Sequence, residues 1–203
     1  MGLRLLILDL WTPKYIIRKE LENISVQITT ALETLASKYN IETADLKQKR
    51  QPKTIQEQRM VMAKTQAKLV EKLKHAVGHQ EAVKLSRNAL FSVGQNLGKQ
   101  ARKNLGVSDT QNDLIRSARI LYRILGIEFH LEWHSTSSAT LIIDRCALAE
   151  EYSKLTCEVL CATDEGVING LQPKVTMKFK EYMTSGCKNC RAHIYFERQE
   201  VED

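Results

Sequence analysis

The chain of 203 residues lacks several signatures that assign a function directly. It has no Gly-x-Ser-x-Gly sequence, which places the nucleophile in many serine hydrolases, no phosphate-binding P-loop and no glycine-rich dinucleotide fingerprint. It also has no internal repeat and no low-complexity tract. These absences argue against a serine hydrolase of that type, a P-loop nucleotidase, a Rossmann dehydrogenase and a repeat protein.

Long hydrophobic runs are missing as well. The apolar stretch at residues 3–11 is interrupted by Arg4 and Asp9 and is too short to cross a bilayer. No small-residue cleavage site follows it, so we expect neither a membrane span nor a signal peptide. We expect this segment to dock on the core or on a partner.

Cysteine is absent from the first 145 residues, and the five cysteines of the chain all lie in its last third: Cys146, Cys157, Cys161, Cys187 and Cys190. An odd number of cysteines without an export signal indicates a reducing compartment, so we expect a cytoplasmic protein. In such a compartment, closely spaced cysteine pairs serve metal or redox chemistry more often than disulfide bonds.

Positive charge is concentrated in one part of the chain. Residues 47–103 contain 14 Lys or Arg and three Glu, a net charge of +11, whereas the whole chain has +6, which leaves −5 elsewhere. Such asymmetry indicates an anionic partner, either nucleic acid or a membrane surface. The alternative is a solvated helical face, because the basic residues fall on the polar side of the helical pattern.

Amphipathic helices dominate the first two thirds of the chain. Apolar residues three or four apart predict helices over residues 13–39, 55–77, 80–104 and 108–125, and the polar residues 40–54 predict a linker. Thr12 before Pro13 is typical of a helix start, and Ser108 with Gln111 is typical of a capping box. Gly126 is expected to end the fourth helix.

The apolar period then changes from 3.6 to 2, which is typical of strands. Alternation predicts one hairpin around a turn at residues 135–137, a helix over residues 147–171, and a second hairpin over residues 175–196. We therefore expect an α+β protein, with an N-terminal helical region followed by a ββ-α-ββ antiparallel sheet domain. We expect residues 1–54 to be a helix and linker that extend the fold or dock a partner, and residues 55–203 to form the cysteine-containing domain.

The last four cysteines form two pairs at metal-ligand spacing. Cys157 and Cys161 share one face of a predicted helix, and Cys187 and Cys190 flank a tight turn between the last two strands. If the helix packs over the turn, the four thiolates converge on zinc or, alternatively, on an iron–sulfur cluster. Two other interpretations stay open: unmetallated thiols that line a ligand pocket or act as nucleophiles, and cysteines that only pack the helix against the sheet.

Cys146-Ala147 and the runs at residues 157–164 (CEVLCATD) and 186–192 (GCKNCRA) carry a resemblance. They resemble the C-terminal half of the L-2-amino-thiazoline-4-carboxylic acid hydrolase family, over roughly residues 80–198. The ending is also similar to the 4-vinyl reductase type of small-molecule-binding domain, an α+β fold whose members can hold zinc through cysteines.

The resemblance implies a hydrolase that opens a thiazoline ring by adding water and yields a carbamoyl-cysteine. Two positions depart from the family pattern: Ala147 stands where the family has Pro, and Cys187 stands where an Asp follows the glycine. The second change replaces a carboxylate by a thiol, which leaves the substrate open and favours a sulfur-rich site.

Two carboxylates near Cys161 are candidates for proton transfer. Asp164 continues the face of Cys157 and Cys161, and Glu165 lies one turn beyond Cys161. If a metal with an open position is present, its bound water is the nucleophile and Asp164 or Glu165 moves the proton. Without a metal, a Cys157 thiolate would attack directly.

Four further residues are predicted near the same pocket. Asp144 and Cys146 are two residues apart on one strand, so they are expected to share a face and to form a wall of the pocket. His130 and Glu132 also share a strand face, where they would act together on a substrate proton or a metal. The alternative for this second pair is a solvated strand face.

Three functions are consistent with these patterns. The first is a small-molecule hydrolase with a cysteine-lined, metal-bound or metal-free pocket, which we favour because its family similarity is the closest. The second is a ligand sensor or carrier with a structural metal and a basic helical surface for an anionic partner. The third is a zinc or iron–sulfur protein in which all four paired cysteines bind the cofactor. A homodimer is compatible with each.

Overall fold

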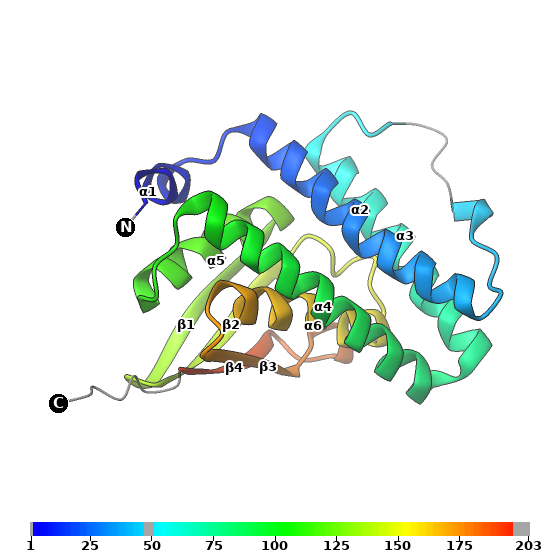
Figure 1. Ribbon diagram of the computed structural model, residues 1–203. Coiled ribbons are helices and arrows are strands. Elements are labelled where there is room, and N and C mark those ends of the chain that lie inside the picture. Colours follow the sequence, from blue (N-terminus) through cyan, green and yellow to red (C-terminus); the bar gives the residue numbers. More distant parts are fainter. Residues whose placement is uncertain (1, 47–50, 197–203) are drawn as a thin grey trace.

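The computed structural model describes residues 2–46 and 51–196. It has the predicted α+β architecture, in which a helical N-terminal region precedes a four-stranded antiparallel sheet (Figure 1). Residues 47–50 of the basic segment and residues 197–203 of the predicted cysteine-containing domain lie outside the described residues. No described helix is long and apolar enough to cross a membrane.

The helices follow the predicted apolar periodicity closely. They are α1 (Leu3–Leu10), α2 (Lys14–Lys38), α3 (Ile55–Val77), α4 (His79–Leu105), α5 (Gln111–Leu125) and α6 (Lys154–Leu171). Single 3-10 turns lie at Ala44–Leu46 and Met183–Ser185. The apolar segment at residues 3–11 forms α1, and its inward side chains Leu5 and Leu8 are buried.

Two helix starts differ from the prediction because other side chains cap them. The side chain of Thr110, rather than that of Ser108, accepts a hydrogen bond from the backbone N–H of Asp113 and caps α5. α6 begins at Lys154 rather than at residue 147, because the Ser153 side chain caps it there and residues 147–151 form turns.

The sheet has the strand order β1-β2-β4-β3, with β1 (Ile127–Ser135), β2 (Ser138–Cys146), β3 (Val175–Glu181) and β4 (Cys190–Phe196). The two predicted hairpins therefore pair through β2 and β4. Glu128 pairs with Arg145 and Phe129 pairs with Ile143, so Asp144 is an extra residue in β2. This β-bulge interrupts the alternation of side chains before the strand ends.

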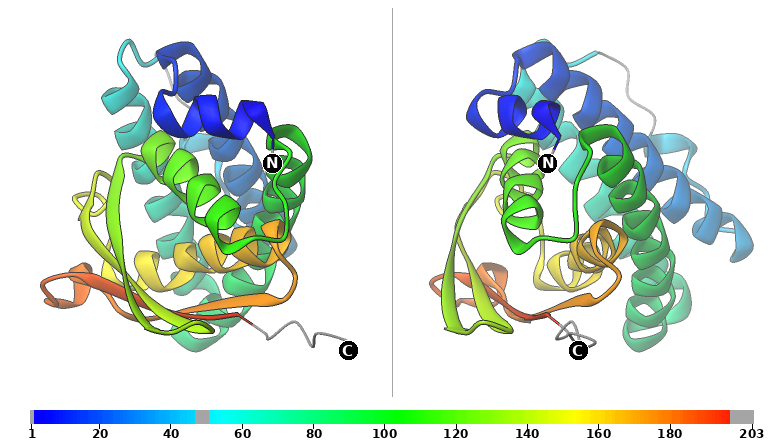
Figure 2. Two further views of the ribbon diagram at one scale, coloured as in Figure 1. Left: turned by 90° about the vertical axis from the view of Figure 1, so that its left-hand side faces the viewer. Right: turned by 60° about the vertical axis from the view of Figure 1, so that its left-hand side comes forward.

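The molecule is built in layers behind one face of the sheet (Figure 2). α5 contacts β1 and α6 contacts β3, so these two helices cover the inner face of the sheet. α4 lies against α6, and α2 packs on α3, α4 and α5. Buried apolar residues from Leu5 to Phe196 form one continuous core. α2, which precedes the predicted domain boundary near residue 54, packs against α3 and α4, which follow it. Whether the two parts fold separately stays a prediction.

α4 and α6 approach so closely that their backbones touch. A Cβ atom built on Gly94 or Gly98 of α4 would lie 2.1 or 2.3 Å from a carbonyl oxygen of α6. A Cβ atom on Gly166 or Gly170 of α6 would in turn lie 2.2 Å from a carbonyl oxygen of α4. Two glycines spaced four residues apart on each helix thus form an interlocked contact without side chains, which fixes α6 relative to the rest of the fold.

Three arginines bind the free carbonyls at helix C-termini. Arg123 donates to the carbonyl oxygens of Leu8 and Asp9 at the end of α1, over 2.9 and 2.8 Å. Arg59 donates to the last carbonyls of α5, and Arg102 donates to the carbonyl of Leu171 at the end of α6. Since these carbonyls have no intrahelical partner, the arginines satisfy groups that the helices leave open.

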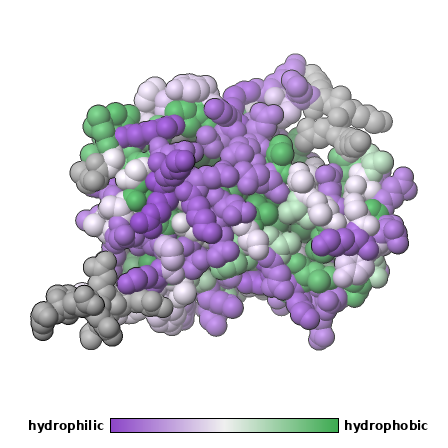
Figure 3. Space-filling model, viewed as in Figure 1, coloured by the Kyte–Doolittle hydropathy of each residue, from purple (hydrophilic) through white to green (hydrophobic). Residues whose placement is uncertain are grey.

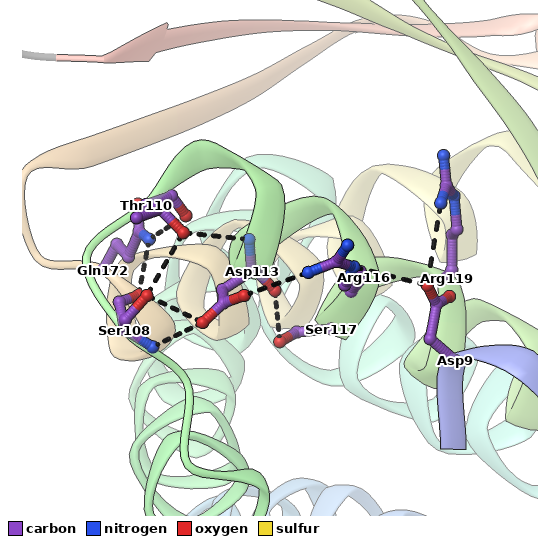
Figure 4. A network of polar contacts seen from close by, with 8 residues as sticks. All are labelled: Asp9, Ser108, Thr110, Asp113, Arg116, Ser117, Arg119 and Gln172. Carbon is purple, nitrogen blue, oxygen red and sulfur yellow. Dashed lines mark hydrogen bonds and ion pairs between the residues drawn. The ribbon is translucent and has the colours of Figure 1, made fainter. Parts of the chain in front are cut away.

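A polar network joins α1, the start of α5 and the end of α6 (Figure 4). Asp113 is buried and accepts hydrogen bonds from the N–H and hydroxyl of Ser108, over 3.0 and 2.7 Å. Burial would raise the pKa of Asp113, but these two hydrogen bonds and nearby positive charge, including that of Arg116, together lower it. Arg116 bridges Asp113 and Asp9, so the network fastens α1 to α5.

The basic segment has several internal roles that the sequence pattern did not indicate. Arg59 and Arg102 cap helices, Arg87 pairs with Glu165, and Lys64 and Lys72 pair with acidic residues of other segments. These intramolecular contacts pair part of the positive charge from which an anionic partner was predicted. Such a partner stays a prediction for the remaining exposed residues of α3 and α4.

Candidate functional site

A cavity of about 200 Å³ lies between the helices and the inner face of the sheet. Most of its lining is apolar and comes from all six helices and from all four strands or the turns beside them. It reaches the surface where exposed polar side chains belong to the lining: Arg4 of α1, Asn23 of α2, and Gln100 and Asn104 of α4. We call this group the mouth of the cavity.

The sulfur atoms gather in another part of the lining. Four of the five cysteines line the cavity: Cys146, Cys157, Cys161 and Cys190. Cys157, Cys161 and Asp164 share the inward face of α6, as their spacing predicted, because positions i, i+4 and i+7 lie on one side of a helix. Cys190 points inward from β4. Cys187 is partly exposed in the turn before β4 and does not belong to the lining.

Asp164 is a carboxyl group in largely apolar surroundings. It lines the cavity and has no hydrogen-bond or ion-pair partner among the described residues. Burial raises the pKa of Asp164 to about 7, and the charge of Glu165 adds to the increase. A carboxyl group with a pKa near neutrality can both accept and donate a proton under physiological conditions, which is typical of general acid–base residues.

The thiols of the cavity have raised pKa values. Burial raises the pKa of Cys157 to about 12 and those of Cys146 and Cys161 to about 11. The pKa of Cys190 is also raised by burial. At neutral pH these groups are thiols rather than thiolates, so their raised pKa values do not favour the predicted attack by Cys157.

Glu165 has a structural environment that differs from that of its neighbour Asp164. Its carboxylate forms an ion pair of 2.7 Å with Arg87 of α4 and accepts a hydrogen bond of 3.2 Å from the backbone N–H of Phe179. The Arg87 guanidinium also donates to the sulfur of Cys161 over 3.1 Å. Glu165 is buried and lies outside the cavity lining, so of the two carboxylates predicted for proton transfer only Asp164 borders the cavity.

The predicted four-cysteine metal site is not assembled. Among residues 2–46 and 51–196, no group of three or more His, Cys, Asp or Glu side chains could hold a metal ion. Cys161 is held by Arg87, whose positive charge opposes a cation at the same sulfur, and Cys190 accepts a hydrogen bond from the N–H of Met183. These side chains do not fit the zinc or iron–sulfur site that the spacing predicted.

Three residues predicted near the pocket lie on the outer face of the sheet instead. His130 hydrogen-bonds Asp144 over 2.7 Å, and Glu132 pairs with Arg191 over 3.1 Å. All three are exposed. Asp144 follows the inward Ile143 and therefore points outward, and the bulge at Asp144 returns Cys146 to the cavity, so the two residues do not share a face as predicted. The alternative of a solvated strand face was correct for His130 and Glu132.

Two buried polar residues of the cavity lining, Gln66 and Thr163, were absent from the sequence prediction. Gln66 of α3 is fully buried, its carbonyl oxygen accepts a hydrogen bond from the hydroxyl of Tyr152, and its amide nitrogen has no partner among the described residues. The Thr163 hydroxyl is likewise buried without a partner. A signal was present for Gln66, because it continues the apolar stripe of Met62 and Leu69 on α3.

This geometry can be compared with known proteins. The sequence model of L-2-amino-thiazoline-4-carboxylic acid hydrolases matches residues 58–194. The chain belongs to this family. The match in this thiazoline hydrolase family member begins at residue 58, whereas the resemblance in the sequence analysis began near residue 80. The matched part therefore includes Gln66 as well as Asp164. It leaves out α1 and α2, which contribute Arg4 and Asn23 to the mouth.

Two solved structures share the fold at low sequence identity. One is subunit 3 of a trafficking protein particle complex from Naegleria fowleri, covalently bound to palmitic acid, with 15% identity and a TM-score of 0.54 over 69% of this chain and 95% of that chain. The other is the phenol-responsive sensory domain of the transcription activator PoxR with phenol, with 14% identity and a TM-score of 0.54 over 68% of this chain and 76% of that chain. No curated protein sequence matches this family member.

Proposed function

We propose that the protein binds a small molecule in the cavity and hydrolyses it, with Asp164 transferring the proton. The observation that carries the proposal is an unpaired carboxyl group on the wall of a mainly apolar cavity. Isolated carboxyl groups are costly in such surroundings, so a position of this kind is typical of a functional group. Membership of the thiazoline hydrolase family supports water addition as the reaction type.

In the proposed reaction, the Asp164 carboxylate accepts a proton from water while the water oxygen bonds to the ring carbon between the two heteroatoms. In this addition the ring C=N bond becomes a single bond. The protonated carboxyl then donates its proton to the leaving heteroatom as the bond of that atom to carbon breaks, and the second water proton passes from the new hydroxyl to the ring nitrogen as the carbonyl forms. The net change is the addition of one water to the substrate, and Asp164 returns to its starting state. The free amide nitrogen of Gln66 is suited to orient the substrate by donating to one of its acceptor atoms.

The test is hydrolysis of 2-amino-thiazoline-4-carboxylate by the wild type, by Asp164→Asn and by Asp144→Asn. We expect Asp164→Asn to lower kcat about 100-fold or more, as is usual for loss of a general acid–base group. Asp144→Asn, the same change on the outer face, should keep activity within about 2-fold, because its side chain does not reach the cavity. Full activity in Asp164→Asn would contradict the proposed role, and a wild type without turnover would contradict this substrate.

A second candidate is a ligand carrier or sensor without catalysis. The largely apolar lining of the cavity favours it, as do the two similar folds that hold palmitic acid and phenol. Native mass spectrometry of the purified protein, followed by denaturation, would reveal a co-purified apolar ligand. Calorimetric titration with phenol and with palmitate would then separate a carrier, which binds without turnover, from a hydrolase.

A further inference from the structure

Exposed apolar side chains gather at the N-terminal end of the molecule. Five large residues there are 53–86% exposed: Leu3, Ile7, Leu10, Trp11 and Tyr15. Leu3, Ile7 and Leu10 are three or four residues apart, so they form one stripe on the outer side of α1. Figure 3 shows apolar surface at the upper left, where Figure 1 draws α1. We call these five residues the apolar patch.

The apolar patch lies on a helix that is firmly held. The opposite side of α1 buries Leu5 and Leu8, and Arg123 binds the carbonyls at its C-terminal end. Asp9 pairs with Arg116 and Arg119 of α5. α1 is therefore fixed to α5 by its inner face alone, and its outer apolar stripe has no partner within the described chain.

Basic side chains surround the apolar patch. Arg4, Lys14, Arg18 and Lys19 are exposed beside it, whereas the acidic Asp9 is turned inward and neutralised by α5. Glu20 follows Lys19 on α2 and lines the cavity together with Arg4, and Glu22 lies further along the same helix. A cationic rim around aliphatic and aromatic side chains matches an anionic lipid surface, where Trp and Tyr prefer the headgroup region and Lys and Arg bind headgroups.

We propose that α1 and the first turns of α2 dock on an anionic membrane surface. The helix does not span the bilayer, since no described helix is long and apolar enough to do so. Docking would place Arg4, which lies beside the apolar patch and belongs to the mouth of the cavity, at the lipid surface. Membrane docking involves the outer face of α1 and does not depend on the proposed chemistry at Asp164.

Trp11 allows a direct test. In a Trp133→Phe background, Trp11 is the one remaining tryptophan of the chain, so its emission reports on the apolar patch. We expect a blue shift when the protein is titrated with vesicles in which about one third of the lipid is phosphatidylserine, and little shift with vesicles of phosphatidylcholine alone. High salt should weaken the binding, because the electrostatic contribution is screened.

Two sets of variants separate the contributions. Leu3→Ser with Ile7→Ser and Leu10→Ser should weaken vesicle binding about 100-fold or more, because three apolar side chains no longer insert. Lys14→Gln with Lys19→Gln should weaken it roughly 10-fold and reduce its salt dependence. Val26→Ser, which changes an exposed apolar residue outside the patch, is the matched control and should bind like the parent.

Circular dichroism should confirm that each variant is folded, since all the changed side chains are exposed. The proposal is overturned if the parent protein does not bind the anionic vesicles, or if the triple serine variant binds them equally well. It is also overturned if the parent is a dimer by light scattering, does not bind vesicles, and becomes a monomer in the triple variant. In that case a second copy of the chain covers the apolar patch.

Discussion

Adjacent carboxylates of α6 have opposite environments. Glu165 is neutralised by Arg87 and accepts a backbone hydrogen bond, whereas Asp164, one residue earlier, borders the cavity without a partner among the described residues. A rotation of about 100° per residue along a helix explains how neighbours in sequence face different surroundings. The ion pair of Glu165 helps to fix α6 against α4, and Asp164 is left with a pKa that suits proton transfer.

The raised pKa of Asp164 makes stability depend on pH. The pKa rises from 3.8 to about 7 on folding, so the folded protein holds the proton more tightly. The protonated form therefore favours folding below pH 4, and this contribution is lost as the pH rises towards 7, at a cost of up to about 4 kcal/mol above that pH. Asp164→Asn should abolish this dependence.

Urea denaturation at pH 5 and pH 8 would test the expectation for Asp164. We expect Asp164→Asn to be more stable than the wild type at pH 8, with a smaller difference at pH 5. Asp144→Asn is the control, because Asp144 is exposed and hydrogen-bonds His130 on the outer face. If the wild type and Asp164→Asn show the same change between the two pH values, the carboxyl group does not titrate near neutrality.

At the scale of elements, the contact of α4 with α6 decides where the functional face of α6 lies. The glycines of this contact were absent from the sequence prediction, although each helix carries two of them four residues apart, a spacing that allows helices to approach closely. The structure shows that Gly94 and Gly166 lie where the backbones of α4 and α6 are in contact. The apolar and polar periodicities, in contrast, predicted the helices and strands well because they reflect burial within each element.

Substitution of Gly94 by Ala tests the helix contact. The added Cβ atom would lie 2.1 Å from the carbonyl oxygen of Thr163, so α4 and α6 must separate. We expect a loss of about 2 kcal/mol or more in the free energy of unfolding, despite the gain in helix propensity of about 1 kcal/mol. Ser92→Ala, at an exposed position on the same helix, should change stability by less than about 0.5 kcal/mol. Chemical denaturation measures both, and equal stabilities would contradict the contact.

At the scale of the whole molecule, one continuous core runs from α1 to β4. We therefore expect a single unfolding transition, in which Trp11 on α1 and Trp133 on β1 report the same midpoint in urea. Fluorescence of the Trp11→Phe and Trp133→Phe variants, together with circular dichroism, would measure the two ends separately. A lower midpoint for the Trp11 signal would show that residues 1–54 unfold on their own, as the predicted domain boundary implies.

Part of the site could be predicted from sequence and part could not. The shared face of Cys157, Cys161 and Asp164 followed from helical spacing alone. The ion pair of Glu165 depends on Arg87, 78 residues earlier, and the inward position of Cys146 depends on a bulge that period-2 alternation does not reveal. Local periodicity thus predicts which residues share one face of a helix or strand, whereas the residues that this face contacts depend on the tertiary structure.

The arginine caps set an order of events during synthesis of the chain. Thr12 caps the Leu8 carbonyl locally, but Arg123 binds the same carbonyl across 115 positions, so this second contact cannot form until α5 has been made. Long-range contacts of this kind form only after the intervening chain has been closed into a loop. During synthesis, the apolar α1 therefore leaves the ribosome well before α5, against which it packs, has been made. During that interval, the same helix is available to a chaperone or to a nearby bilayer.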